Sequence, residues 1–224
     1  MMFKPAEAGG AAAEVSASMR HSEVVFRAGG QLGDGTHEFD IPIDSTVESA
    51  FFFVSMQCLQ SVTVVRPTSD ELAADAAGVE YHGFEAARLI TVPAPMPGVW
   101  RVTVVGRGLL SVVVKAKTNL TLAKVAFGND ASQAKGAPGR RRLEASMSGA
   151  AHVAGHLAFQ LVSPMGAALE TVDLVLEKET DNGRTYEGEA VPPETPFRLA
   201  MTGIDRQGFR FQRVQKQLLG FDRD

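Results

Sequence analysis

Hydrophobic and polar residues alternate with a period of two along most of the chain. Trp100, Val102 and Val104 fall on one side of an extended segment, while Arg101 and Thr103 fall on the other. Successive side chains of a β-strand point to opposite faces, so this alternation is typical of a sheet with one buried and one solvated face. The pattern predicts an all-β chain and places Trp100 in its core.

Segments of this kind are short and are separated by turn residues. The glycines of Val105–Leu109 predict a tight hairpin, and so do the turn residues of Asp181–Gly183 and Ile204–Gly208. Three prolines in residues 93–97 predict an extended connector, because proline cannot occupy a central strand. One short Ala-rich helix is predicted over Ser69–Ala77. Strands are predicted near 23–28, 36–43, 47–56, 60–66, 79–82, 87–92, 98–106, 109–117, 119–127, 140–148, 154–163, 170–178, 184–190, 195–203 and 207–216.

The number and spacing of the strands predict two consecutive antiparallel β-sandwich domains. We place the boundary near residue 120, with a flexible leader over residues 1–19, a first sandwich over 20–120 and a second over 121–224. Charge divides unevenly between them, since residues 1–120 hold 9 basic and 13 acidic side chains and the remainder holds 13 of each. Within the first sandwich, the consecutive Phe51, Phe52 and Phe53 cannot all face one core, so one is expected at an interface or at the surface.

Composition excludes several classes of protein. Apolar residues make up 45% of the chain, which is too much for a disordered protein, and a single cysteine cannot form an internal disulfide. No apolar run approaches the roughly 18 residues of a membrane-spanning helix, and no secretory signal opens the chain. The net charge of −4 provides no basic field for nucleic acid or anionic lipid. We therefore expect neither nucleic-acid binding nor membrane insertion.

The residues with reactive side chains do not form a catalytic or metal-binding pattern. His152 and His156 have a metal-like spacing, but on a strand they would lie roughly 13 Å apart, too far for one ion. Cys58 has no histidine near it in sequence, which predicts an inert buried thiol. The segment Asp44–Ser49 fails the Asp-x-Ser-x-Ser spacing of a metal-dependent adhesion motif. We therefore predict no catalytic residue, no metal and no cofactor, and a protein that is not an enzyme.

Two groups of short motifs stand out in the chain. They are Pro97–Val104, Gly106 and Ser111–Ala116 in the first group, and Tyr186–Gly188, Pro192–Pro193, Pro196–Leu199, Gly203–Asp205, Gly208 and Phe211–Arg213 in the second. Together they resemble the region that follows the von Willebrand factor A domain in hemicentin and in von Willebrand factor A domain-containing protein 7, although the A domain itself and its metal motif are absent. The resemblance implies a galactose-binding-like sandwich followed by an immunoglobulin-like sandwich, in an extracellular or cell-surface setting.

The resemblance implies a non-catalytic role in adhesion or interaction. The chain would bind a protein or glycoprotein partner, or act as a spacer between such partners. The alternative is a carbohydrate-binding module, because the first sandwich is expected to be galactose-binding-like. Its candidate site is the cluster of Tyr81, His82 and Phe84 beside the loop that begins at Asp70.

Overall fold

The computed structural model describes residues 22–128 and 139–220, and it confirms the all-β prediction. The predicted leader over residues 1–19 lies outside the described residues. Within them the regular structure is β-strand, apart from one 3₁₀ turn (η1, Ala150–His152), and no helix is long and apolar enough to span a membrane. The strands are β1 (Glu23–Ile43), β2 (Val47–Val65), β3 (Glu80–Gly83), β4 (Ala87–Pro93), β5 (Gly98–Thr118), β6 (Thr121–Phe127), β7 (Arg141–Ser148), β8 (Val153–Val162), β9 (Ala168–Val172), β10 (Val175–Glu179), β11 (Gly183–Ala190), β12 (Arg198–Asp205) and β13 (Arg210–Val214).

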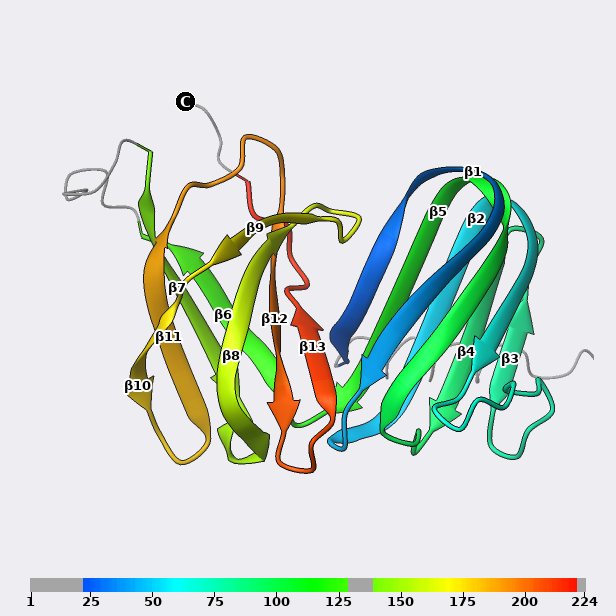
Figure 1. Ribbon diagram of the computed structural model, residues 1–224, viewed down its shortest axis with the longest axis horizontal. Helices are drawn as coiled ribbons and strands as arrows, with labels where there is room; N and C mark the ends of the chain where they lie inside the picture. Colours follow the sequence, from blue (N-terminus) through cyan, green and yellow to red (C-terminus); the bar gives the residue numbers. More distant parts are fainter. Residues whose placement is uncertain (1–21, 129–138, 221–224) are drawn as a thin grey trace, which may run out of the picture.

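The first half of the chain is one antiparallel sheet, in the order β3-β4-β2-β5-β1, that folds back on itself. The long strands β1, β2 and β5 bend over near their middles, so that their two ends lie on opposite sides of a shared core (Figure 1). That core contains Ile41, Phe52, Val54, Trp100 and other buried side chains from both ends of these strands. The predicted place of Trp100 in the core is confirmed, since its side chain is buried and its Nε1 donates to the carbonyl of Met96 at 2.8 Å.

The predicted hairpin over Val105–Leu109 is wrong. β5 continues through this segment and pairs with β1 on both sides of it, with a register shift between Leu32 and Gly35. Gly106 and Gly108 do have the positive φ that a turn would need, at 152° and 98°. Here that freedom bends a continuous strand instead of reversing it, because β1 bends at the same level and keeps the ladder paired.

The predicted helix over Ser69–Ala77 is also wrong. The segment forms turns, and an isolated antiparallel bridge joins Val65 to Glu71. Leu72 is buried in the first core and its N–H donates to the carbonyl of Val64 at 2.7 Å, while Ser69 has a φ of +70° that an α-helix does not allow. Burial of one leucine against the sheet has overridden a weak local helix preference.

The second half is a sandwich of two antiparallel sheets, in the orders β6-β7-β11-β10 and β13-β12-β8-β9. If β6 to β13 are lettered A, B, C, C′, D, E, F and G along the chain, the two sheets have the orders A-B-E-D and G-F-C-C′. These are strand orders that immunoglobulin-type sandwiches use. Their facing surfaces enclose a second core that includes Leu143, Phe159, Phe197 and Phe211. The hairpins predicted at Asp181–Gly183 and Ile204–Gly208 are confirmed as the β10–β11 and β12–β13 turns.

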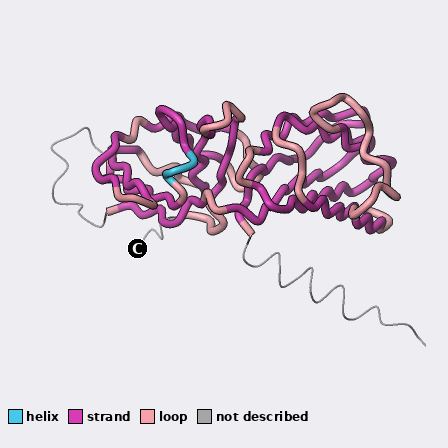
Figure 2. The backbone as a smooth tube through the Cα atoms, turned by 90° about the horizontal axis from the view of Figure 1, so that it is seen from below, coloured by secondary structure: helices cyan, strands magenta, loops and turns pink. Residues whose placement is uncertain are grey.

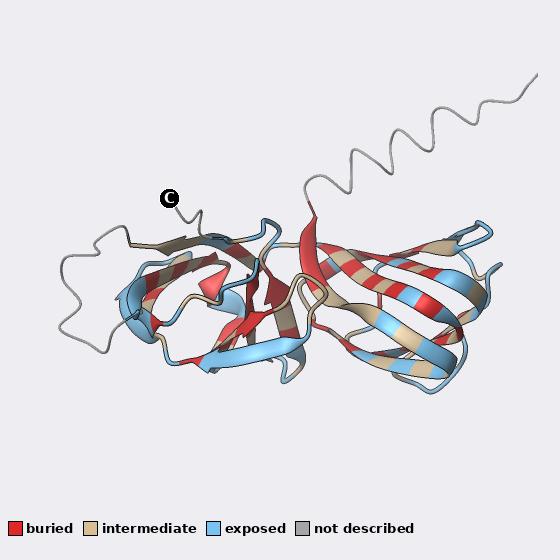
Figure 3. Cartoon of the chain, turned by 90° about the horizontal axis from the view of Figure 1, so that it is seen from above, coloured by how far each residue is buried: buried red, intermediate tan, exposed pale blue. Residues whose placement is uncertain are grey.

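The two halves lie side by side along the longest axis of the molecule and share one nine-stranded sheet (Figure 2). The sheet passes from one half to the other where Val24 of β1 pairs with Val214 of β13. These two valines also form a small buried cluster with Val162 and Ala200 of the second half. Buried and exposed positions alternate as bands along the strands of the first half (Figure 3). The predicted boundary near residue 120 falls in the link between β5 and β6.

Candidate functional site

A buried arginine joins the two halves. Arg213 of β13 is fully buried, and its Nη2 lies 2.8 Å from Oδ2 of Asp44, which is equally buried in the turn between β1 and β2. Its Nε donates to the carbonyl of Leu120 at 2.6 Å, and its Nη2 donates to the hydroxyl of Thr118 at 3.0 Å. Burial lowers the pKa of Arg213 below its ordinary value, and the charge of Asp44 opposes that shift. One side chain of the second half is therefore held by the first half and by the link.

A second contact lies beside the first. Asp205 at the end of β12 accepts hydrogen bonds from the N–H of Ser45 at 2.8 Å and from its hydroxyl at 2.6 Å. The other carboxylate oxygen accepts from the N–H groups of Gln207 and Phe209, both at 2.9 Å, which fixes the β12–β13 turn. Burial acts to raise the pKa of Asp205, but these hydrogen bonds outweigh it, so the pKa lies below its usual value. We call the Arg213–Asp44 and Asp205–Ser45 contacts the junction latch.

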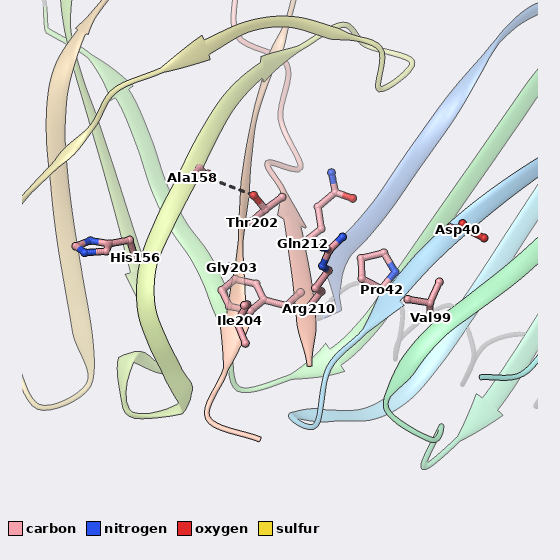
Figure 4. A pocket seen from close by; sticks show the side chains of 11 residues that line it. Asp40, Pro42, Val99, His156, Ala158, Thr202, Gly203, Ile204, Arg210 and Gln212 are labelled. Carbon is pink, nitrogen blue, oxygen red and sulfur yellow. Dashed lines mark hydrogen bonds between the residues drawn. The ribbon is translucent and has the colours of Figure 1, made fainter. Parts of the chain in front are cut away.

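An open groove of about 550 Å³ lies next to the junction latch, between the two halves (Figure 4). In Figure 4, Arg210 and Gln212 rise from β13 beside Pro42 of β1. The first half supplies β1 and β5 to its walls, and the second half supplies β8, β12 and β13. We call it the junction groove; its lining residues are Asp40, Pro42, Val99, His156, Ala158, Thr202, Gly203, Ile204, Arg210, Phe211 and Gln212.

The junction groove combines exposed apolar side chains with polar ones. Val99 on the first half and Ile204 on the second are each 47% exposed, which leaves an apolar contact surface on both walls. Asp40 is held by an ion pair with Arg101 at 2.9 Å. By contrast, the guanidinium of Arg210 has no hydrogen-bond or ion-pair partner within residues 22–128 and 139–220. Such a surface can bind a partner through apolar contacts and one free cation.

Residues proposed from the sequence as a ligand site lie elsewhere. Tyr81 and His82 belong to β3, the four-residue edge strand at the far end of the nine-stranded sheet, and Phe84 follows in the turn to β4. Alternation along the strand points Tyr81 and His82 to opposite faces. Phe84 is 60% exposed and its carbonyl accepts a hydrogen bond from Arg88. None of the three lines the junction groove, and all three are exposed.

The histidines and the cysteine also take separate positions. His152 lies in η1, where its carbonyl accepts from the N–H of Arg206 at 2.9 Å, and His156 lies on β8 at the rim of the junction groove. Within the part of the chain that the structure describes, no group of three or more metal-ligating side chains occurs. The prediction that Cys58 is buried is wrong, since the residue lies exposed on β2. A register shift next to Cys58, where β2 bends, changes which side chains face the core.

Comparison with known proteins gives no family assignment. No family model matches the chain, and no curated protein matches it. A solved structure that aligns with it is the crystal structure of Bacillus licheniformis lipase BlEst2 in its propeptide form, at 11% sequence identity and a TM-score of 0.40. That alignment covers 86% of this chain and 40% of the lipase chain.

Proposed function

We propose that this protein is a non-catalytic interaction module that binds a segment of a protein or glycoprotein partner in the junction groove. The observation that carries the proposal is that both halves contribute strands to the groove, while the buried junction latch fixes those halves against each other. Walls held in place before binding lose little conformational freedom on binding, which favours affinity.

The chemistry of the groove fits a polypeptide segment. Interfaces between proteins place apolar contacts at the centre and polar groups at the rim. Val99 and Ile204 offer such contacts from opposite walls, and Arg210 offers a cation for an acidic side chain or a carbonyl of the partner. The adhesion setting of such a module rests on the sequence resemblance alone.

A peptide-display selection on the purified chain tests the proposal. Peptides recovered from a random library are measured for binding to the native chain and to the variants Val99→Asp and Ile204→Asp. A charge placed on either wall is expected to weaken binding at least about tenfold, because it leaves a desolvated carboxylate against the apolar face of the peptide.

Val175→Asp is the matched control, since Val175 is 69% exposed on β10 and does not line the groove. It is expected to leave binding unchanged. Peptides that bind the two groove variants as tightly as the native chain would contradict the proposal. Recovery of binders only from a glycan array, with loss on replacing Tyr81 or Phe84, would favour a carbohydrate-binding module instead.

A further inference from the structure

A second hollow, of about 230 Å³, opens on the outer face of the first half and shares no lining residue with the junction groove. It is lined by Arg27 of β1, Phe51 and Phe53 of β2, and Val113 and Lys115 of β5. The register of the sheet brings them together, because Val113 pairs with Arg27 on one side and with Phe53 on the other. Lys115 pairs with Phe51 one step along the same ladder. Two cations and two phenyl rings therefore share one concave surface.

The cations of this hollow have no partner within residues 22–128 and 139–220. The Nε–H of Arg27 is buried and donates no hydrogen bond, and the side-chain ammonium of Lys115 forms no hydrogen bond or ion pair. Burying a cation without a partner is costly, and the fully buried Arg213 meets that cost with Asp44. Arg27 is half-buried, and it has no such carboxylate.

Another cation lies near Arg27 and adds to the excess of positive charge. Arg198 of β12 is only 8% exposed, and it donates to the carbonyls of Gln215 and Lys216, while its Nε is buried without a partner. Burial lowers the pKa of Arg198, and the nearby charge of Arg27 lowers it further. Burial also lowers the pKa of Arg27. An anion at this place would relieve both arginines.

The backbone that carries Arg27 is held by the second half. The turn between β8 and β9 packs against β1, so that a Cβ on Gly166 would lie 2.0 Å from the carbonyl oxygen of Arg27. In the same way, a Cβ on Gly29 would lie 2.6 Å from Cε of Met165. The approach of the yellow β8–β9 turn to β1 is visible in Figure 1. This contact fixes the strand from which Arg27 projects.

From this geometry we infer that the hollow is a binding site for a small organic anion, a carboxylate joined to an apolar or aromatic body. The planar guanidinium of Arg27 matches a carboxylate with two parallel hydrogen bonds, and Lys115 adds a second charge. Phe51 and Phe53 provide the surface for the apolar body. The hollow, at about 230 Å³, is smaller than the sites of about 300–1,000 Å³ that hold drug-sized molecules, so its ligand must be small. The inference does not depend on the proposed function of the junction groove.

Titration of the ¹⁵N-labelled full chain with phenylacetate, followed by NMR, tests the inference. The Nε–Hε signal of Arg27, assigned by its loss in Arg27→Gln, is expected to shift and saturate. The neutral isostere 2-phenylacetamide is expected to bind at least about tenfold more weakly, because it cannot form charge-assisted hydrogen bonds. Arg27→Gln is expected to weaken phenylacetate binding by a similar factor, and Lys115→Gln by about threefold.

Arg107→Gln is the matched control, since Arg107 is an exposed arginine on the same strand as Lys115 and lies outside the hollow. It is expected to bind phenylacetate as the native chain does. Equal binding of the acid and the amide, or an unchanged affinity in Arg27→Gln, would overturn the inference. A shift that never saturates would do the same. If Arg27→Gln does not fold, the comparison of acid with amide on the native chain and the Lys115→Gln variant decide the question.

Discussion

Replacing Arg213 by methionine is expected to be the most damaging single change to the junction between the halves. Methionine keeps much of the length of the side chain but removes the charge, and so it leaves Asp44 buried without its cation. It also removes the hydrogen bonds to the carbonyl of Leu120 and to the hydroxyl of Thr118. Breaking a fully buried ion pair by removing one partner costs about 3–5 kcal/mol of unfolding free energy.

Equilibrium unfolding in urea measures this loss, since urea does not screen charges. Trp100 is the single tryptophan and lies in the first core, so its fluorescence reports on the first half, while circular dichroism reports on both. We expect coincident transitions in the native chain. In Arg213→Met we expect a lower midpoint and separated transitions, because one of the two contacts of the junction latch that couples the halves is lost.

Two further variants serve as comparisons for the buried ion pair. Arg101→Met breaks the exposed ion pair with Asp40, in which the side chains are 50% and 58% exposed, and should lower the urea midpoint far less than Arg213→Met does, because solvent screens an exposed pair. Adding Asp44→Asn to Arg213→Met removes the buried uncompensated charge and should recover part of the lost stability. A loss in Arg213→Met no larger than that in Arg101→Met, or no recovery in the double variant, would show that the buried pair does not carry the junction.

Two more predictions follow from the same region and from the bend of β5. The pKa of Asp205 is lowered in the folded state, so its contribution to stability is present above its unfolded pKa of about 3.9 and is lost as the pH falls from there through the folded-state pKa. Asp205→Asn should therefore flatten the acid limb of a plot of unfolding free energy against pH. An unchanged limb would refute the role of the Ser45 contact. Gly106→Ala should cost about 1–3 kcal/mol, because its Cβ would lie 2.3 Å from the carbonyl oxygen of Cys58 at a φ of +152°. Gly33→Ala, where no atom lies within 4 Å of the added Cβ, should change the urea midpoint little, and equal losses at the two glycines would contradict this packing.

Alternation of residue types was sufficient to predict where the chain forms β-structure, while the glycines of Val105–Leu109 and the short helical signal at Ser69–Ala77 were misleading. The face that buries Trp100 is evident from its neighbours at i+2 and i+4, because strand period is a local property. By contrast, Gly106 and Gly108 fit a hairpin turn and a bent strand equally well. The choice between them is made by β1, which lies more than sixty residues away and bends at the same level.

The candidate sites could not be found from sequence because their residues meet only in the folded chain. Ser45 and Asp205 are 160 residues apart, and nothing local distinguishes Asp44 or Arg213 among 26 acidic and 22 basic side chains. The triple phenylalanine did carry a usable signal. Phe52 is in the first core, and Phe51 and Phe53 line the hollow on the outer face, as expected for neighbours that point to opposite sides.

Methyl NMR of the chain with a display-selected peptide shows directly where on the molecule the peptide binds. We expect saturable shifts at Val99, Ala158 and Ile204, which place methyl groups on both walls of the junction groove. Shifts that cluster instead around Tyr81 and Phe84, with the groove methyl groups unmoved, would contradict binding in the junction groove.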